Sequence, residues 1–454
     1  MDWRKAVLPL AILISLALVS CSQQQEDSIA FTNVNLVTMT DESVIELQTV
    51  LVHSSKIVAI GDSDVLEIPE GTQLIDGQGA FLMPGVADMH MHTREDWEDQ
   101  SIWPVHPLKL YLANGVTTVR DFAPQGSNLT YALRWRDEIR AGTRAGPTIY
   151  ASGKLLYASP LGDPEEIVRR NYDLGFDFLK LYSYLSVEDF HAAIKTAKGL
   201  GMYTAGHIPF AIGLDGVLAE GMDEIAHVEE FFFEFIDFDR NMGLAPEEWL
   251  PYIAESALLQ IDLSSSTHQA DFQRENIKVV DAVMHMKLFQ SGAFLARPEN
   301  RFFESGYLET FRRGQEKHQV ECRGIEGLCA FKVDIDRWVL GGLHDAGVLL
   351  LLGTDSGTGG MGIVPGYSIH DELSILVENG FSPYEALATG TVNAAGVVER
   401  MTGEGDFGTI EVGKRADLIL VAGNPLQDIS SLRTPLGVMA AGRWYSRETL
   451  ADLI

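Results

Sequence analysis

Short apolar runs that alternate with helical patterns fill the middle of this chain and restrict its fold more than any other feature. Eight of these runs have the length and composition of strands, and turn residues bound each of them. They lie at residues 86–92, 115–122, 146–153, 176–183, 201–208, 223–230, 258–266 and 347–355. Strands that alternate with helices form parallel sheets, so eight of them predict an α/β fold, a (β/α)8 TIM barrel.

The segment after the fourth strand illustrates the helical pattern. Ser186 is a typical first cap residue, and Asp189, three positions later, predicts a capping box. Phe190, Ile194 and Ala197 share one helical face, and glycines at 199 and 201 predict the end of the helix.

The two ends of the chain have a different pattern from the middle. Residues 29–82 and 405–454 contain short apolar runs separated by turn residues, which predict antiparallel strands of a small sheet. The barrel would then occupy residues 83–404.

One barrel unit is longer than the others. The interval from Ser266 to Asp355 is 89 residues, which predicts an insertion at about 268–335, a candidate lid over the barrel mouth. Cys322 and Cys329 lie in this insertion and could form a local disulfide or remain two unpaired thiols.

The first residues predict export. Arg4 and Lys5 precede an apolar run from Ala6 to Val19, which is too short for a membrane span and fits a signal peptide over residues 1–20. Cys21 then resembles the lipidated first residue of a bacterial lipoprotein, with residues 21–28 as a tether. The resemblance implies a periplasmic protein anchored to the outer membrane; the alternative is simple secretion with Cys21 incidental.

Charge narrows the choice of partners. The chain has 34 Lys and Arg against 64 Asp and Glu, a formal net charge of -30. Such a surface repels phosphate backbones and anionic headgroups, which argues against nucleic-acid binding and leaves the lipid anchor as the only predicted membrane contact. The sequence allows a homo-oligomer.

Potential metal ligands stand at the ends of the predicted strands. They are His90, His92, Lys180, His207, His227 and Asp355. Side chains alternate along a strand, so His90 and His92 point the same way and can share one ion, and imidazole suits zinc. The alternative for each histidine is a buried ring that hydrogen-bonds to the backbone.

Several motifs together resemble a known family. MPGVADMHMHT, FDFLKLYS, AGHIPF, EIAHVEE, LLGTDSG and FGTIEVGKRADLILVAGNPL closely resemble the metal-dependent amidohydrolase superfamily, over nearly all of residues 29–447. The likeness is strongest to the imidazolonepropionase-like branch, which includes prolidase-like dipeptidases. It implies that the two end segments fold together into a small β-sandwich beside the barrel.

The resemblance also assigns the ligands. It implies His90, His92 and Asp355 around one divalent ion, His207 and His227 around a second, and Lys180 between them. A neutral lysine amine can add carbon dioxide to form an anionic carbamate, which in the members it resembles bridges two ions; the ligand types favour zinc. Some relatives bind one metal, and the sequence alone also allows an uncharged or solvent-facing Lys180.

The expected activity is hydrolysis of an amide bond in a small molecule, most concretely a dipeptide. Asp355 would take the proton of the attacking water as general base and return it to the leaving nitrogen. Tyr182 could contact the substrate. His370 could orient the site, or it could be a helix cap or a surface residue. Arg120 and Asp121 could bind a carboxylate or pair with each other.

Three alternatives remain beside the dipeptidase. One is hydrolysis of a cyclic amide or imide. Another is a lyase that uses Lys180 to form a Schiff base, although the surrounding histidines would have little purpose in it. The third is a noncatalytic binding lipoprotein, against which the full ligand set argues.

Overall fold

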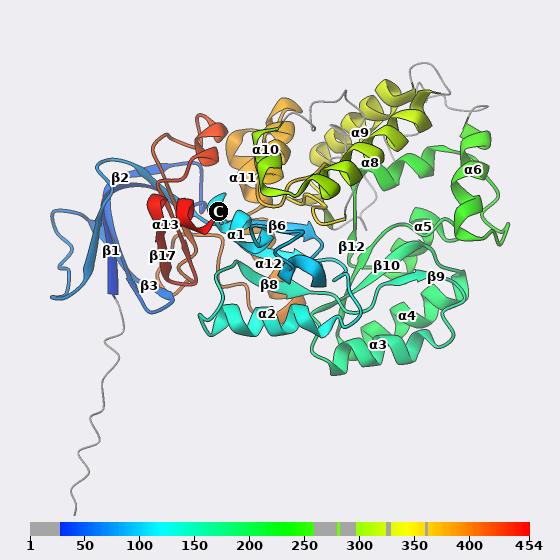
Figure 1. Cartoon of the computed structure of the whole chain (residues 1–454), viewed down its shortest axis with the longest axis horizontal. Coiled ribbons are helices and arrows are strands. Elements are labelled where there is room, and N and C mark those ends of the chain that lie inside the picture. The colour runs from blue at the N-terminus through cyan, green and yellow to red at the C-terminus, as the bar shows by residue number, and fades with distance from the viewer. Residues whose placement is uncertain (1–27, 258–278, 282–296, 324–327, 359–361) are drawn as a thin grey trace, which may run out of the picture.

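The computed structural model describes residues 28–257, 279–281, 297–323, 328–358 and 362–454. Strands from both ends of the chain form one sheet on one side, and parallel strands with covering helices form the rest (Figure 1). In these described ranges, none of the helices has the length and apolar character needed to cross a membrane.

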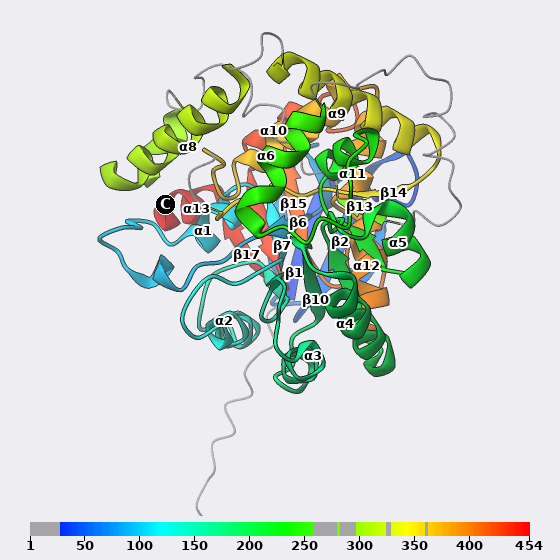
Figure 2. The ribbon, with the colours of Figure 1, turned by 90° about the vertical axis from the view of Figure 1, so that its right-hand side faces the viewer.

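The parallel strands form two sheets. A six-stranded sheet has the order β14-β13-β12-β11-β10-β9, and a three-stranded sheet has the order β6-β7-β8. Their bounds are β6 (Val86–Met91), β7 (Val116–Asp121), β8 (Thr148–Ala151), β9 (Leu156–Ala158), β10 (Phe178–Tyr184), β11 (Tyr203–Gly206), β12 (Glu224–Ile225), β13 (Val279–Asp281) and β14 (Leu349–Leu351). In Figure 2 these strands lie in the centre and the helices surround them.

Backbone contacts connect the two parallel sheets at both edges. Ser152 forms a parallel bridge with Phe178, and Met91 forms one with Ser356. Met89 N also donates to Leu352 O at 2.8 Å. The predicted α/β class with parallel strands is therefore confirmed, whereas closure of a complete barrel stays a prediction.

Seven of the predicted strands overlap observed ones, and two differences are informative. The candidate at 258–266 lies outside the described residues, and the strand between β12 and β14 is β13, inside the range predicted as an insertion. β9 was not predicted. Both strands have only three residues, too few for alternation to separate a strand from a turn of helix.

The terminal segments share one eight-stranded sheet of order β17-β16-β15-β5-β1-β2-β3, with β4 beside β1. Their bounds are β1 (Ser28–Val37), β2 (Val44–His53), β3 (Lys56–Asp62), β4 (Gln73–Asp76), β5 (Phe81–Pro84), β15 (Leu418–Val421), β16 (Gly437–Ala440) and β17 (Arg443–Ser446). Buried Phe31, Leu82 and Leu418 pack together in its core. The predicted sandwich stays a prediction, because the strands assigned here form a single sheet.

A tight junction joins this sheet to the first parallel strand. β5 ends at Pro84 and β6 begins at Val86, with Gly85 between them. A Cβ atom on Gly85 would lie 2.1 Å from Thr117 Oγ1, so only glycine fits there. The terminal sheet thus sets the position at which the strand with His90 and His92 begins.

The helix predicted after the fourth strand is α4 (Val187–Leu200). Ser186 Oγ accepts from Asp189 N at 3.2 Å, and Gly201 ends the helix with a φ of 70°, as its sequence predicts. The predicted capping box is wrong: the Asp189 carboxylate accepts instead from Leu161 N at 3.0 Å and from Ser159 Oγ. A tertiary partner outcompetes the local one because Ser159 also accepts from Ser186 N at 2.8 Å.

The other helices cover the parallel strands and line the edges of the molecule (Figure 2). They are α1 (Pro107–Ala113), α2 (Thr130–Arg140), α3 (Pro164–Asp173), α5 (Gly213–Glu220), α6 (Pro246–Ala257), α8 (Ser305–Arg323), α9 (Leu328–Asp345), α10 (Ser368–Glu378), α11 (Pro383–Thr389), α12 (Val392–Thr402) and α13 (Arg447–Leu453). Cys322 lies in α8 and Cys329 in α9, but their side chains lie outside the described part of the structure.

A buried ion pair joins two of the parallel strands. Arg120 in β7 donates from Nη1 to Glu224 Oε2 in β12 at 2.8 Å and from Nε to Met89 O at 2.8 Å. Tyr203 OH donates to the same carboxylate at 3.0 Å. Of the two predicted roles of Arg120 and Asp121, mutual pairing is wrong, and the carboxylate that Arg120 binds is that of Glu224. Neighbouring residues of a strand point to opposite sides, so they cannot pair, and Asp121 accepts from Thr93 Oγ1 instead.

Candidate metal centre

The first parallel strand carries two buried imidazoles to its carboxyl end. His90 is fully buried and His92 is 8% exposed. The His90 ring stacks on Phe122, with 3.8 Å between ring centroids and 14° between planes. His92 Nδ1 lies 3.2 Å from the carbonyl oxygen of Ala123. Both rings are therefore held by β7 and the residues after it, and the His92 Nε2 edge faces the centre of the site.

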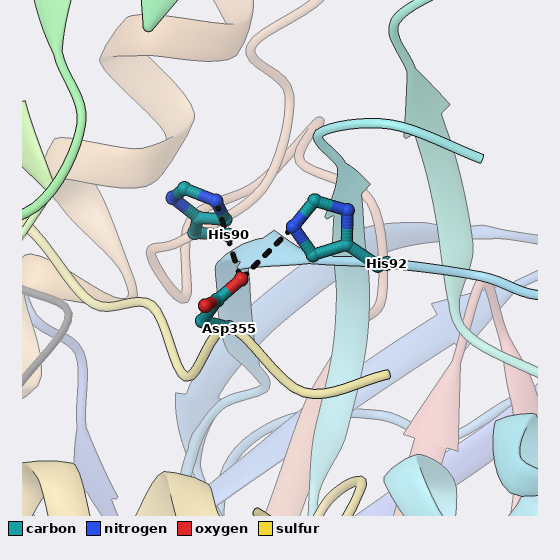
Figure 3. A group of neighbouring side chains, drawn as sticks. All are labelled: His90, His92 and Asp355. Carbon is teal, nitrogen blue, oxygen red and sulfur yellow. Dashed lines mark ion pairs between the residues drawn. The ribbon is translucent and has the colours of Figure 1, made fainter. Parts of the chain in front are cut away.

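Asp355 faces these histidines from the loop after β14 (Figure 3). Its Oδ1 atom lies 2.9 Å from His92 Nε2 and 3.6 Å from His90 Nε2. Asp355 has a φ of 56°, which is unfavourable for a residue with a side chain, and its N–H donates to His90 O at 2.7 Å. The loop therefore holds a strained conformation that aims the carboxylate at the two rings.

These three residues can hold one metal ion. One donor atom from each of His90, His92 and Asp355 lies within 4.8 Å of the others, and all three side chains are buried. Two imidazole nitrogens and a carboxylate oxygen are a donor set that zinc and similar divalent ions accept.

The ring of His227 lies beside that of His90 and the ring of His207 beside that of His227, so that the four candidate histidines form a row, the histidine row. The His227 centroid lies 4.6 Å from that of His90 and 4.8 Å from that of His207. His227 also has a positive φ, 65°. The structure thus brings together all four histidines predicted as ligands, although they lie at the ends of three different strands, β6, β11 and β12.

Lys180 lies beside this row. Its side chain is 2% exposed, and Nζ lies 4.5 Å from the Phe122 ring centroid and 5.9 Å from that of Tyr182. A solvent-facing Lys180, one of the sequence alternatives, is therefore wrong. Its charge is felt at the site, because burial first and then Lys180 hold the pKa of His90 well below its usual range.

The pKa of His92 moves in the other direction. Burial opposes a charge on the ring, but the hydrogen bond and the negative charge of Asp355 outweigh burial and raise its pKa. Asp355 thus favours a positive charge between itself and His92, which a metal ion supplies as well as a proton does.

Comparison with known proteins agrees with this geometry. Residues 324–445 match the model of the amidohydrolase family. The chain contains an amidohydrolase-family domain. This match confirms the family predicted from the motifs and, with it, an enzyme that acts on carbon–nitrogen bonds.

Similar proteins cover most of the length of this chain. Ochratoxinase of Aspergillus niger is 23% identical over 463 residues, which covers 86% of this chain and 80% of the relative. The solved structure of A. niger ochratoxinase covers 92% of this chain and 96% of its own at 18% identity, with a TM-score of 0.60. A Xaa-Pro dipeptidase with bound methionine covers 92% and 100% at 20% identity, with a TM-score of 0.63. At these identities the structural likeness shows the fold.

Sequence reasoning missed a carboxylate that supports His207. Glu230 Oε1 lies 2.7 Å from His207 Nδ1, and Glu230 Oε2 accepts from Ile208 N at 3.1 Å. Ser183 Oγ lies 2.9 Å from the same Nδ1. The contact fixes the ring with Nε2 toward the site, as carboxylates behind metal-ligating histidines do. The only sequence signal was an acidic residue three positions after His227, which is too common to interpret.

We expect replacement of Glu230 to weaken metal binding. Glu230→Ala should reduce zinc affinity about 10- to 100-fold, because the His207 ring loses the carboxylate that orients it. Glu234→Ala is the matched control: it lies on the same 3-10 helix η2 (Val228–Phe235), but its carboxylate pairs with Arg240 at 3.0 Å. Zinc titration by competition with a chelating dye measures both variants. Equal affinities in the two would contradict this role of Glu230.

A second missed residue, Asp88, connects the two segments that carry the ligands. Its carboxylate accepts from Thr354 Oγ1 at 2.6 Å, from Thr354 N at 3.1 Å and from His90 N at 3.3 Å. Burial raises the pKa of Asp88 to about 7. Asp88 therefore holds β6 against the loop of Asp355.

The structure places Tyr182 and His370, the two residues predicted to assist the ligands, in different surroundings. The Tyr182 ring lies 4.0 Å from the His207 ring, within reach of a substrate at the site. His370 is 4% exposed in the first turn of α10, whose cap residue is Tyr367, so its surface and cap alternatives are wrong. Burial lowers the pKa of His370 to about 3, so the ring is neutral. Its role in orienting the site stays a prediction.

A cavity of about 790 Å³ lies elsewhere in the described part of the chain. Its lining includes Tyr150, Arg136 and Arg443, where the terminal sheet meets α2 and β8. None of the six candidate ligands lines it. The site is therefore located by its donor atoms and not by the volume of this cavity.

Proposed function

We propose that this protein is a metal-dependent hydrolase that cleaves amide bonds of small substrates, most concretely a prolidase-like dipeptidase. The observation that carries the proposal is the convergence of His90, His92 and Asp355, whose donor atoms lie within 4.8 Å of one another. The amidohydrolase match and the solved structure of a Xaa-Pro dipeptidase over most of the chain support it.

We propose two divalent ions, and the donor types favour zinc. His90, His92 and Asp355 would hold the first, and His207 and His227 the second. Lys180 would join them as a carbamate formed with carbon dioxide. Its burial beside the histidine row supports this, because a protonated lysine there would be repelled by the ions, whereas a carbamate is an anionic ligand.

The ions, when bound, polarise the substrate carbonyl and lower the pKa of water. The protein's own residues would do the rest. The Asp355 carboxylate accepts a proton at one oxygen and passes it to the leaving nitrogen. Burial raises the pKa of Tyr182, so its hydroxyl stays protonated and can donate a hydrogen bond to the substrate.

We also propose a closed barrel and a complete sandwich for this chain. The two parallel sheets would close into a (β/α)8 barrel, and the terminal segments would complete a β-sandwich. The backbone bridges Met91–Ser356 and Ser152–Phe178 support closure. Residues 1–27 lie outside the described part of the chain, and for them we propose export to the periplasm, with a lipid anchor at Cys21 as the only membrane contact.

A dipeptide library tests the proposed function. The zinc-loaded protein should hydrolyse a subset of the library, and activity should disappear after chelation and return with zinc. Hydrolysis of cyclic amides but not of dipeptides would favour the cyclic-amide alternative. Zinc binding without turnover of either class would favour a binding lipoprotein.

Borohydride trapping tests the lyase alternative. A Schiff base at Lys180 would be reduced to a stable adduct in the presence of a carbonyl substrate. We expect no adduct, because the buried lysine is committed to the metal centre. Covalent capture at Lys180, located by peptide mass analysis, would overturn the hydrolase.

A further inference from the structure

A row of tyrosine rings extends outward from the candidate ligand His207. The Tyr182 ring lies 4.0 Å from that of His207, and the Tyr157 ring lies 4.9 Å from that of Tyr182. Tyr184 completes the row at 5.3 Å from Tyr157. Tyr157 is 47% exposed, so the row presents aromatic surface next to the metal centre.

The Tyr184 end of the row is fixed by the fold. Tyr184 packs against Phe210, with 5.7 Å between centroids, and Phe210 packs against Trp249 of α6 at 5.6 Å. Phe210 and Trp249 are buried in one hydrophobic cluster. The strands of Tyr157 and Tyr184 also pair directly, at Tyr184 and Ala158. The rings are therefore held in place before any ligand arrives, which reduces the entropy cost of binding.

We propose that Tyr157, Tyr182 and Tyr184 form a subsite for an aromatic side group of the substrate amide; this rests on the proposed function. The ring steps of 4.0 and 4.9 Å place the Tyr157 ring at most about 9 Å from the His207 ring, a distance that two to three extended residues span at about 3.3–3.6 Å each, so a small peptide can reach both. Aromatic rings attract one another at centroid distances of about 4.5–7 Å, so a substrate ring fits against the exposed Tyr157.

The contacts of the row favour an aromatic group over a cationic one. The nearby carboxylates Glu230 and Asp355 already pair with imidazoles, Glu230 with His207 at 2.7 Å and Asp355 with His92 at 2.9 Å. A substrate cation would therefore find ring faces but carboxylates that are already paired. An aromatic group of the substrate needs no charged partner, because contact with the tyrosine rings is itself favourable.

Selectivity between matched dipeptides tests the subsite. The zinc-loaded protein and its variants are assayed for kcat/KM on Phe-Ala and Leu-Ala, and on Ala-Phe and Ala-Leu. Tyr157→Ala should lower the preference for Phe over Leu in one series by about three- to tenfold. Tyr157→Phe, which retains the ring, should keep the preference. Tyr172→Ala is the matched control, because Tyr172 is also 47% exposed but lies on α3.

The possible results distinguish the aromatic subsite from the proposed function on which it rests. An unchanged Phe preference in Tyr157→Ala, or an equal loss in Tyr172→Ala, would overturn the subsite. Lys-Ala and Ala-Lys are assayed beside these dipeptides, and a loss confined to them would overturn the aromatic class. If no dipeptide is hydrolysed, the proposed function fails by itself. Binding of N-acetyl-phenylalaninamide against N-acetyl-leucinamide then decides the subsite, with a selective loss in Tyr157→Ala supporting it and no loss overturning it.

Discussion

Asp355→Asn should lower kcat/KM by about 10²- to 10⁴-fold while most zinc remains bound. Asparagine has nearly the same shape and keeps one oxygen toward His92, but it cannot accept the proton of the attacking water. The substitution also suits the backbone, because the φ of 56° at this position is tolerated best by asparagine and aspartate among residues with side chains. Loss of turnover would then report proton transfer and not a misplaced loop.

The measurement pairs kinetics with metal content in the same preparation. Asp334→Asn is the control: its carboxylate is 72% exposed and lies 3.8 Å from Arg337, away from the ligands. This variant should keep wild-type turnover and zinc. Full activity in Asp355→Asn would remove Asp355 from the reaction, whereas loss of all zinc would make it a ligand whose catalytic role is not separable by this substitution.

Glu224→Ala should destabilise the protein by about 3–5 kcal/mol. The variant leaves the Arg120 guanidinium fully buried without its carboxylate, and Tyr203 OH loses its acceptor. Unfolding in urea, followed by tryptophan fluorescence, measures the change. Arg120 also packs over the Phe122 ring at 4.6 Å, and His90 stacks on the same ring, so the packing around the candidate ligand His90 should also be weakened.

An exposed ion pair supplies the control for Glu224→Ala. Glu165 and Arg169 lie 3.6 Å apart, with side chains 58% and 57% exposed. Glu165→Ala should change stability by about 0–1 kcal/mol, because water already solvates both charges. Replacing both members of the buried pair by apolar residues, as in Arg120→Met with Glu224→Leu, should recover much of the loss. Equal effects of Glu224→Ala and Glu165→Ala would contradict a structural role for the buried pair.

Much of the fold could be predicted because its strands are long enough to show a pattern. β6, β7 and β10 have six or seven residues with clear boundaries, and their helices begin at recognisable caps such as Ser186. β9 and β13 could not be predicted, since three residues show no period and their pairing depends on neighbours distant in sequence, whereas the three-residue β14 lies within the longer apolar run at 347–355. The capping box predicted for Asp189 was wrong for a similar reason, because its actual partner, Ser159, belongs to another strand-helix unit.

Residues of the candidate site could be predicted where they lie at the end of a predicted strand. Alternation placed His90 and His92 on one side, and the structure brings them to Asp355. Their metal-binding role stays a prediction. Glu230 and Asp88 could not be predicted, because each acts through a contact with another segment and carries no local motif. The partners of Arg120 were missed because a buried carboxylate on β12 cannot be recognised from its strand alone.

Zinc stoichiometry with and without bicarbonate tests the two-metal centre most directly. Wild-type protein dialysed against zinc and bicarbonate should bind about two ions per chain, and removal of bicarbonate should lower this number. Lys180→Ala should bind about one ion with or without bicarbonate, because it cannot form the carbamate. If wild type and Lys180→Ala bind the same number of ions, and bicarbonate changes neither, the carbamate-bridged centre is contradicted.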